Sequence, residues 1–168
     1  MGKVSLRSSK FTLSLPEGIE IERWYYMKDF ESFFPLLKEF LGEVYGNPKR
    51  GLSIYQQKYK ALDYYKNYKA KPNSYLLILK SVGKPVGFLY GRKLKGYSYI
   101  YDIFIKPSYR GKGLGKAFLN AFSLLAPPPY RADVHSKALK DFKKWGFREL
   151  NSYYEDQVLW HLVEATTL

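Results

Sequence analysis

The sequence of 168 residues contains no cysteine and only two histidines, His135 and His161. Without cysteine there can be no disulfide, no thiolate metal ligand and no cysteine nucleophile. A metal centre rich in histidine is nearly excluded as well, because zinc sites take three or four protein ligands. The sequence therefore predicts no metal site, and a chain of this length can be stabilised by its hydrophobic core alone.

Long hydrophobic runs are also missing, and none approaches the ~20 residues that a membrane span requires. The first ten residues carry charge with no apolar stretch behind them, which is not the pattern of a secretory signal. Leu6 occupies the position at which N-myristoylation requires Ser or Thr. We therefore expect a soluble, cytoplasmic protein that does not bind membranes.

Acidic residues are few, since 15 Asp and Glu stand against 28 Lys and Arg, which gives a formal net charge of +13. Such a surface attracts anions, for example nucleic acid, an acidic protein or a phosphorylated cofactor. An excess of one charge also keeps a protein soluble. The charge by itself therefore does not choose among these partners.

Hydrophobic periodicity predicts one α+β domain over residues 1–168, in which residues 1–10 form a mobile tail. Runs of apolar residues and turn signals indicate a mostly antiparallel sheet. The expected strands are 11–15, 19–23, 74–80, 86–92, 97–106, 130–134, 147–150 and 157–163, and the expected helices are 33–44, 52–69, 114–125 and 137–145.

Two local details follow from these elements. If Ser32 caps the first helix, Pro35 occupies its third position, where the missing N–H costs nothing. Strict alternation along the strand 97–106 places Tyr101 on one face of the sheet and Asp102 on the other.

The helix expected at 52–69 is unusually rich in tyrosine, and lysines fill the gaps between the aromatic residues. Interleaved aromatic and basic side chains can bind single-stranded nucleic acid. Aromatic residues at helical spacing, however, more often pack against a core. We favour the core and keep nucleic-acid binding as an alternative.

The segment 102–116 runs from a strand through a loop rich in glycine into a helix. Arg110, Gly113 and Gly115 fit the pattern Arg/Gln-x-x-Gly-x-Gly/Ala. Glycines let successive backbone N–H groups approach a ligand closely, and the start of a helix adds unpaired N–H groups and the positive end of its dipole. The segment therefore predicts a loop that binds a pyrophosphate.

Two other nucleotide-binding motifs do not match this loop. Ala117 stands where a Walker loop requires Ser or Thr, and Phe118 stands where the dinucleotide fingerprint requires its third glycine. The loop is therefore predicted to bind a different phosphorylated ligand from those two classes.

With this loop, the segment Tyr101–Leu125 resembles the acyl-CoA-binding motif of the GNAT superfamily of N-acetyltransferases. The order of elements from Ile19 to Val163 is similar to that of the family, and Trp145-Gly146-Phe147 resembles the end of its pattern. The resemblance implies the GNAT-like acyl-CoA N-acyltransferase fold, a mixed, mostly antiparallel sheet flanked by helices. It also implies acetyl-CoA as co-substrate, with no metal.

The resemblance implies as well which residues bind acetyl-CoA. In the family, a strand that splays before the loop pairs its backbone with the pantetheine arm, and loop N–H groups bind the pyrophosphate. By position, the residues along the pantetheine arm would be Ile103, Phe104 and Ile105. The residues that bind the pyrophosphate would be Arg110, Gly111, Lys112, Gly113, Leu114, Gly115 and Lys116.

Two positions depart from the family pattern. His135 stands where the family commonly has Asn at the start of its last helix, and we expect Ser136 to cap that helix instead. Phe142 stands where the usual general acid of the family is Tyr. Since Phe has no proton to give, the acid is absent or has moved to Tyr153 or Tyr154.

The general base is also open between two residues. Asp102 and Asp133 both lie near the positions at which relatives have a carboxylate, and each can equally be a structural, ion-paired residue. No serine stands beside a histidine in a recognisable nucleophilic arrangement, so we expect no covalent enzyme intermediate.

The sequence thus predicts an acetyl-CoA-dependent N-acetyltransferase that acts by direct transfer. The acceptor would be a small molecule or a peptide with an α-amine or another weakly basic amine. Two alternatives stay open: a non-catalytic acyl-CoA-binding module on the same fold, and a nucleic-acid-binding domain that uses residues 52–69. The oligomeric state is left open.

Overall fold

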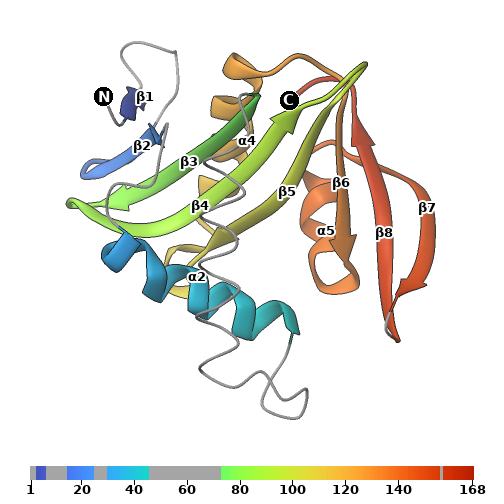
Figure 1. Cartoon of the computed structure of the whole chain (residues 1–168), viewed down its shortest axis with the longest axis horizontal. Coiled ribbons are helices and arrows are strands. Elements are labelled where there is room, and N and C mark those ends of the chain that lie inside the picture. The colour runs from blue at the N-terminus through green and yellow to red at the C-terminus, as the bar shows by residue number, and fades with distance from the viewer. Residues whose placement is uncertain (1–2, 7–14, 25–29, 46–72, 156) are drawn as a thin grey trace.

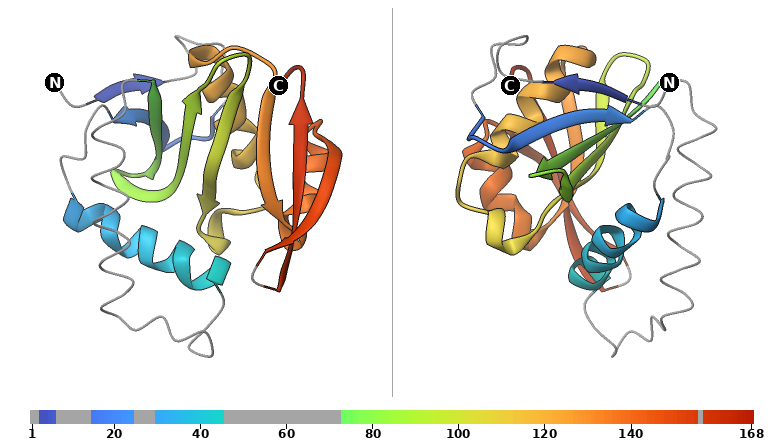
Figure 2. Two further views of the ribbon diagram at one scale, coloured as in Figure 1. Left: turned by 45° about the vertical axis from the view of Figure 1, so that its right-hand side comes forward. Right: turned by 90° about the vertical axis from the view of Figure 1, so that its left-hand side faces the viewer.

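The structure is a computed structural model that describes residues 3–6, 15–24, 30–45, 73–155 and 157–168. Its elements form three layers (Figure 1; Figure 2). The middle layer is a sheet. Helix α2 (Phe30–Tyr45) covers one face, and helices α4 (Leu114–Leu125) and α5 (Ser136–Lys144) cover the other. The helix expected at 52–69 and most of the strand expected at 11–15 lie outside the described residues.

The described residues form an eight-stranded sheet in the order β1-β2-β3-β4-β5-β6-β8-β7. Neighbouring strands pair antiparallel, except for β5 and β6, which pair parallel. This confirms the predicted α+β class and the mixed, mostly antiparallel sheet. The strands are β1 (Lys3–Leu6), β2 (Ile19–Trp24), β3 (Ser74–Ser81), β4 (Lys84–Lys93), β5 (Ser98–Ile105), β6 (Tyr130–His135), β7 (Arg148–Glu155) and β8 (Val158–Ala165).

The apolar run in β3 is continuous because both faces of the sheet are covered. Leu77 and Leu79 belong to the hydrophobic cluster beneath α4, whereas Leu76 and Ile78 belong to the cluster beneath α2. Successive side chains of a strand point to opposite faces, so each face receives every second residue. The two clusters hold the helices on either side of the central strands.

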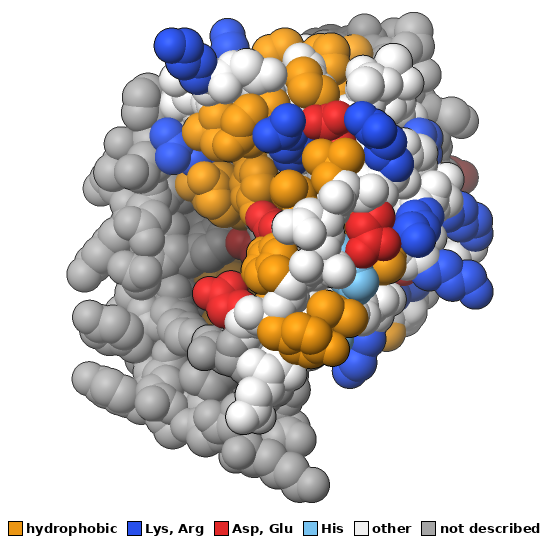
Figure 3. Space-filling model, turned by 90° about the vertical axis from the view of Figure 1, so that its right-hand side faces the viewer, with side chains coloured by type: hydrophobic (Ala, Val, Ile, Leu, Met, Phe, Trp, Pro, Cys, Tyr) orange, Lys and Arg blue, Asp and Glu red, His pale blue; other side chains and the backbone are white. Residues whose placement is uncertain are grey.

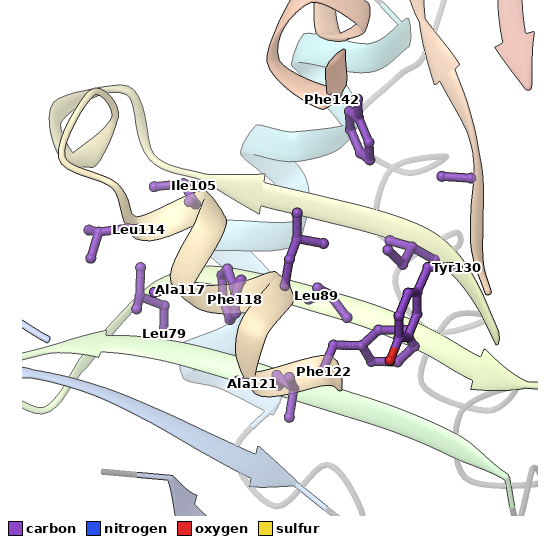
Figure 4. Close-up of a cluster of buried hydrophobic side chains, with 14 of the residues drawn as sticks. Leu79, Leu89, Ile105, Leu114, Ala117, Phe118, Ala121, Phe122, Tyr130 and Phe142 are labelled. Atoms are coloured by element: carbon purple, nitrogen blue, oxygen red, sulfur yellow. The ribbon is translucent and has the colours of Figure 1, made fainter. Parts of the chain in front are cut away.

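Helix α4 is held against the sheet by large side chains of one stripe. Phe118 and Phe122 are fully buried, and they lie over Leu79 and Leu89 of the central strands (Figure 4). Full burial of a side chain of this size stabilises the fold by about 1.5–3 kcal/mol. The helix ends before three prolines, as predicted. Because its buried side chains hold the helix against the sheet, its first residue lies at a fixed place beside β5.

Two predictions about the N-terminal half are wrong. Residues Lys3–Leu6, expected within the tail, form β1 and pair with β2; four residues are too few for a periodicity to be visible without their partner strand. Helix α2 begins at Phe30, so Pro35 lies inside it rather than in its first turn. The buried Phe33 and Phe40 secure the helix against the sheet despite the missing N–H of proline.

Within the described residues, no helix has a stretch long and apolar enough to cross a membrane.

Candidate active site

Strands β5 and β6 separate after a short stretch of pairing. They pair only at residues 98–100 and 130–132, although β5 continues to Ile105 and β6 to His135. On its other side, β5 stays paired with β4 as far as Ile105. The edge of β5 beyond Ile100 therefore has no strand partner among the described residues. Its backbone N–H and C=O groups can pair with a ligand that lies between the two strands.

A β-bulge marks the point of separation. Tyr90 of β4 pairs with Asp102 and Gly91 pairs with Ile100, so Tyr101 is an extra residue in β5. Asp102 consequently lies opposite Tyr90, whose ring centroid is 5.4 Å from that of Tyr101. The prediction that Tyr101 and Asp102 face opposite sides is wrong, because one inserted residue reverses the alternation beyond it.

The bulge also decides which backbone groups of β5 face the gap, that is, the space between β5 and β6 beyond their last pair. The N–H of Lys106 donates to the carbonyl of Val86 in β4. Since successive residues of a strand direct their hydrogen bonds to opposite edges, the backbone groups of Ile103 and Ile105 face away from β4. The carbonyl of Ile105 accepts a hydrogen bond from Arg110 Nε at 2.7 Å. Ile103 thus presents its backbone to the gap in the middle of the predicted pantetheine segment.

The side chain of Arg110 is engaged by the protein on three sides. Besides the Ile105 carbonyl, its Nη2 forms an ion pair with Glu43 Oε2 of α2 at 2.7 Å, and its guanidinium lies 5.4 Å from the centroid of the Phe104 ring. Arg110 therefore joins the end of β5 to α2 and positions the loop. The backbone N–H groups of the loop stay the predicted donors to an anion.

Two glycines of the loop before α4 adopt a left-handed backbone conformation. Gly111 and Gly113 have φ values of +75° and +78°, and a Cβ added to either would meet no atom within 4 Å. Gly113 precedes α4, and no side chain caps the helix there. The N–H of Ala117 donates to the Gly113 carbonyl, so the N–H groups of the residues between them begin the helix without a helical acceptor. Leu114 itself is buried in the core.

The Cα of Gly115 and the side chain of Lys116 face the rest of the protein rather than the loop. A Cβ on Gly115 would lie 2.4 Å from Cζ2 of Trp145, and Lys116 Nζ donates to the Trp145 carbonyl at 3.2 Å. Both contacts join the start of α4 to the end of α5. The ammonium group of Lys112, in contrast, lies over the ring of Tyr109 on the exposed loop.

We expect Gly115→Ala to lower the stability of the protein by about 1–3 kcal/mol, because the added methyl group overlaps Trp145. The matched control is Gly42→Ala in α2, where the added Cβ meets nothing within 4 Å. That change should raise stability by about 0.5–1 kcal/mol through the helix propensity of alanine. Thermal unfolding measures both, at about 2–4 °C per kcal/mol; equal melting temperatures for the two variants would contradict the packing role of Gly115.

Asp133 lies at the other side of the gap, one residue beyond the last pair of β6 with β5. Its Oδ2 accepts a hydrogen bond from the hydroxyl of Tyr99, and its Oδ1 accepts one from Tyr153 at 2.8 Å. Burial and the nearby carboxylate raise the pKa of Tyr153 to about 12 and raise the pKa of Tyr99 as well. Both phenols keep their protons at neutral pH and hold the carboxylate in place.

The two candidate acids, Tyr153 and Tyr154, have different surroundings in the structure. Tyr153 contacts Asp133, while Tyr154, the next residue of β7, points to the opposite face and is 75% exposed. Phe142 is a core residue, 3% exposed, with its ring centroid 5.1 Å from those of both Trp145 and Phe147 (Figure 4). The position at which the family has its general acid is thus occupied by a side chain of the hydrophobic core.

One expectation at the start of α5 is wrong, and the structure also brings together a pair of residues there that the sequence analysis did not find. His135, not Ser136, caps the helix, because its Nδ1 accepts the N–H of Lys137 at 3.1 Å. Ser136 does stand beside a histidine, with its Oγ 2.8 Å from Nε2 of His161. No sequence signal could have found this pair, since the pairing of β6 with β8 brings the two residues together over a separation of 25 positions.

The model of the acetyltransferase (GNAT) family matches residues 20–123, and the chain therefore belongs to this family. No curated protein matches the sequence. Across the described residues, no group of three or more His, Asp or Glu side chains is placed to hold a metal ion.

Solved structures show the same fold. The PaiA N-acetyltransferase of Thermoplasma acidophilum, in complex with coenzyme A, has a TM-score of 0.63 at 16% identity, covering 87% of this chain and 98% of that one. A GNAT-family acetyltransferase from Streptococcus pneumoniae has a TM-score of 0.64 at 17% identity, covering 89% and 99%. A candidate streptothricin acetyltransferase of Bacillus anthracis, in complex with acetyl coenzyme A, has a TM-score of 0.51 at 21% identity, covering 61% and 67%. They confirm the GNAT fold.

Proposed function

We propose that the protein is an acetyl-CoA-dependent N-acetyltransferase that transfers the acetyl group directly to an amine. The observation that carries the proposal is the gap between β5 and β6, which begins at the bulge of Tyr101 and leads to the glycine loop before α4. Bound coenzyme A and acetyl coenzyme A in two structures of the same fold support this choice of co-substrate.

The residues present fit acetyl-CoA as the ligand of this gap. Two glycines with positive φ and open space around them, Gly111 and Gly113, suit the close approach of a pyrophosphate to backbone N–H groups. The first turn of α4 and the exposed Lys112 add positive potential. Ile103 would pair its backbone with the pantetheine amides. The bound thioester supplies the acetyl group.

Asp133 is the residue that we assign as general base. The attacking amine forms a bond to the acetyl carbon, its proton passes to Asp133, and the bond to sulfur breaks. The hydroxyl groups of Tyr99 and Tyr153 hold the carboxylate so that it faces one direction. We propose that the proton then moves from Asp133 through the hydroxyl group of Tyr153, which is hydrogen-bonded to it, to the departing thiolate. Thiols ionise near pH 8.5, so this step needs only partial help.

The other candidate carboxylate, Asp102, lies on the same face as Tyr101, next to the bulge. We propose that these two residues line the acceptor side of the gap, where Tyr101 is 42% exposed. The side of the molecule that carries β7 and β8 shows acidic and hydrophobic side chains in its middle, and basic side chains mostly in its upper part and on the right (Figure 3). An acceptor with a single amine fits this mixed surface.

A weakly basic amine is the acceptor that we propose. A lysine side chain titrates near pH 10.4, so only about one in 10³ is neutral at pH 7, whereas an α-amine near 7.7–8.0 is often neutral. The net charge of +13 also disfavours polyamines, because polycations are repelled. Single α-amines avoid both costs.

One observation favours a second function, a non-catalytic acyl-CoA-binding module. Phe142 fills the position of the family acid and is buried in the core, so the chain could bind acetyl-CoA without turnover. Nucleic-acid binding through residues 52–69 stays a prediction, because that segment lies outside the described residues.

We expect acetyl-CoA at 100 times its Kd to stabilise the protein by about 2.7 kcal/mol, which raises the melting temperature by about 5–11 °C. Thiol release is then measured with three acceptors: a peptide with a free α-amine and an acetylated lysine, the same peptide with the two groups exchanged, and spermidine. The first should react fastest. Fast turnover of spermidine would contradict the proposed acceptor class, and stabilisation without any turnover would identify a binding module.

A further inference from the structure

A second group of reactive side chains lies at the start of α5, on the other face of the sheet from Asp133. The Oγ of Ser136 is 2.8 Å from Nε2 of His161, and Nδ1 of the same ring is 2.6 Å from Oε2 of Glu149. His161 lies opposite Val134, which belongs to the core under α4 and α5. The adjacent residue Asp133 therefore points to the opposite face.

The hydrogen bonds set the direction in which a proton can move. The pKa of Glu149 is lowered, mainly by the hydrogen bond from His161, so its carboxylate is ionised and only accepts. Nδ1 of His161 must then carry the proton. In the neutral ring Nε2 is an acceptor. The Ser136 hydroxyl then has two acceptors within reach, Nε2 at 2.8 Å and the Leu159 carbonyl at 3.3 Å, and the shorter contact is the one through which its proton can pass to His161. A serine, a histidine and a carboxylate joined in this order form the arrangement that activates a serine for nucleophilic attack.

Burial and exposure are divided as such a site requires. His161 is 7% exposed and is fixed at both ring nitrogens, whereas Ser136 is exposed and open to a substrate. Ser136 is also the first residue of α5. His135 Nδ1 accepts the N–H of Lys137, while the N–H groups of Ser136 and Ala138 belong to the first turn, which has no helical acceptors. Such groups stabilise an oxygen that becomes negative during attack.

We propose that Ser136, His161 and Glu149 form a nucleophilic serine site that cleaves esters or thioesters, separate from the site of acetyl transfer. Ser136 Oγ forms a bond to the acyl carbon, and its proton passes to His161 Nε2 and then to the leaving alcohol or thiol. Water cleaves the acyl-serine by the same path, which gives a carboxylic acid and restores the hydroxyl group. Ser136 and His161 are the catalytic residues, and Glu149 is a positioning residue. The balance needs no cofactor.

The full-length protein tests this with two probes, p-nitrophenyl acetate as substrate and a fluorophosphonate as a covalent label of reactive serines. We expect p-nitrophenol release, and peptide mapping by mass spectrometry should place the label on Ser136. Ser136→Ala should lose the label and at least about tenfold of the release rate. The matched control is Ser123→Ala, which removes an α4 hydroxyl bonded only to the Asn120 carbonyl in the described structure, and should change neither.

The role of Glu149 has its own readout. The proton on His161 Nδ1, shared with a carboxylate at 2.6 Å, should give a downfield proton resonance in the NMR spectrum. Glu149→Gln should remove that signal and slow labelling of Ser136, with the fold kept. A purely structural contact would lower the melting temperature without either of these effects.

The proposal is overturned if the wild-type protein takes no label at Ser136, or if wild type and Ser136→Ala release p-nitrophenol at equal rates. Because Ser136 is exposed, its variant should fold, so the result does not depend on the buried His161. Acetyl transfer to an amine should be unchanged in Ser136→Ala. Failure of the wild-type protein to acetylate amines would leave the labelling result interpretable, so the two proposals fail separately.

Discussion

Gly113→Val abolishes detectable binding of acetyl-CoA if the loop before α4 holds the pyrophosphate. Gly113 has a φ of +78° and directly precedes α4. In this left-handed region of φ, a residue with a side chain costs about 1–2 kcal/mol of folding free energy, and a β-branched residue is rarely found there. The side chain would also enter the open space in front of the loop, where the anion is proposed to lie. Isothermal titration calorimetry measures the loss directly.

The matched control is Gly96→Val, in the loop between β4 and β5. Gly96 has a φ of +88°, and a Cβ there also meets nothing within 4 Å, so the backbone strain is similar. We expect this variant to lose stability but to bind acetyl-CoA with its affinity nearly unchanged. Equal affinities in two folded variants would show that the loop at Gly113 does not hold the ligand.

Asp133→Asn should lower the turnover number by about 10²–10⁴-fold, the usual contribution of a general base. The affinity for acetyl-CoA should stay nearly constant, because the change removes an interaction that the amine makes during the reaction. Asparagine keeps the size of the residue and a carbonyl oxygen that accepts from Tyr99 or Tyr153, so the fold should persist. Steady-state thiol release with an α-amine acceptor gives the rate.

Asp141→Asn is the control for Asp133→Asn. Asp141 is an exposed carboxylate on α5, and its backbone carbonyl accepts the N–H of Trp145 irrespective of the side chain. We expect wild-type turnover from this variant. If Asp133→Asn lowers the melting temperature and leaves turnover intact, Asp133 is structural and the base lies elsewhere, with Asp102 as the next residue to replace.

Lys112 and Arg110 show which properties of a residue a sequence motif predicts and which it does not. The pattern of glycines and cations correctly locates a loop with positive φ values at the start of a helix. It does not distinguish Lys112, whose ammonium group lies over the ring of Tyr109, from Arg110, whose guanidinium bonds to Ile105 and Glu43 although the side chain is 42% exposed. It also does not distinguish Gly113, needed for its φ, from Gly115, needed for the contact with Trp145. Those differences arise from α2 and α5, which the motif does not contain.

The sequence by itself determined the elements that depend on local pattern. Alternation and helical stripes predicted the sheet from β2 to β8 and the helix Leu114–Leu125. The spacing at which apolar residues recur shows whether one or both faces of an element are buried. The loop 110–116 and its resemblance to the GNAT family were visible for a similar reason, since backbone conformation and glycine are directly coupled.

Only the tertiary structure decided the arrangements that depend on register. A bulge of one residue moved Tyr101 and Asp102 to the same face, and strand pairing brought Asp133 between Tyr99 and Tyr153. The contact of Ser136 with His161, and through it with Glu149, likewise needs helix α5 to be packed beside the paired strands β7 and β8. Such contacts link residues far apart in the chain, and their partners are selected by the packing of the whole sheet rather than by local composition.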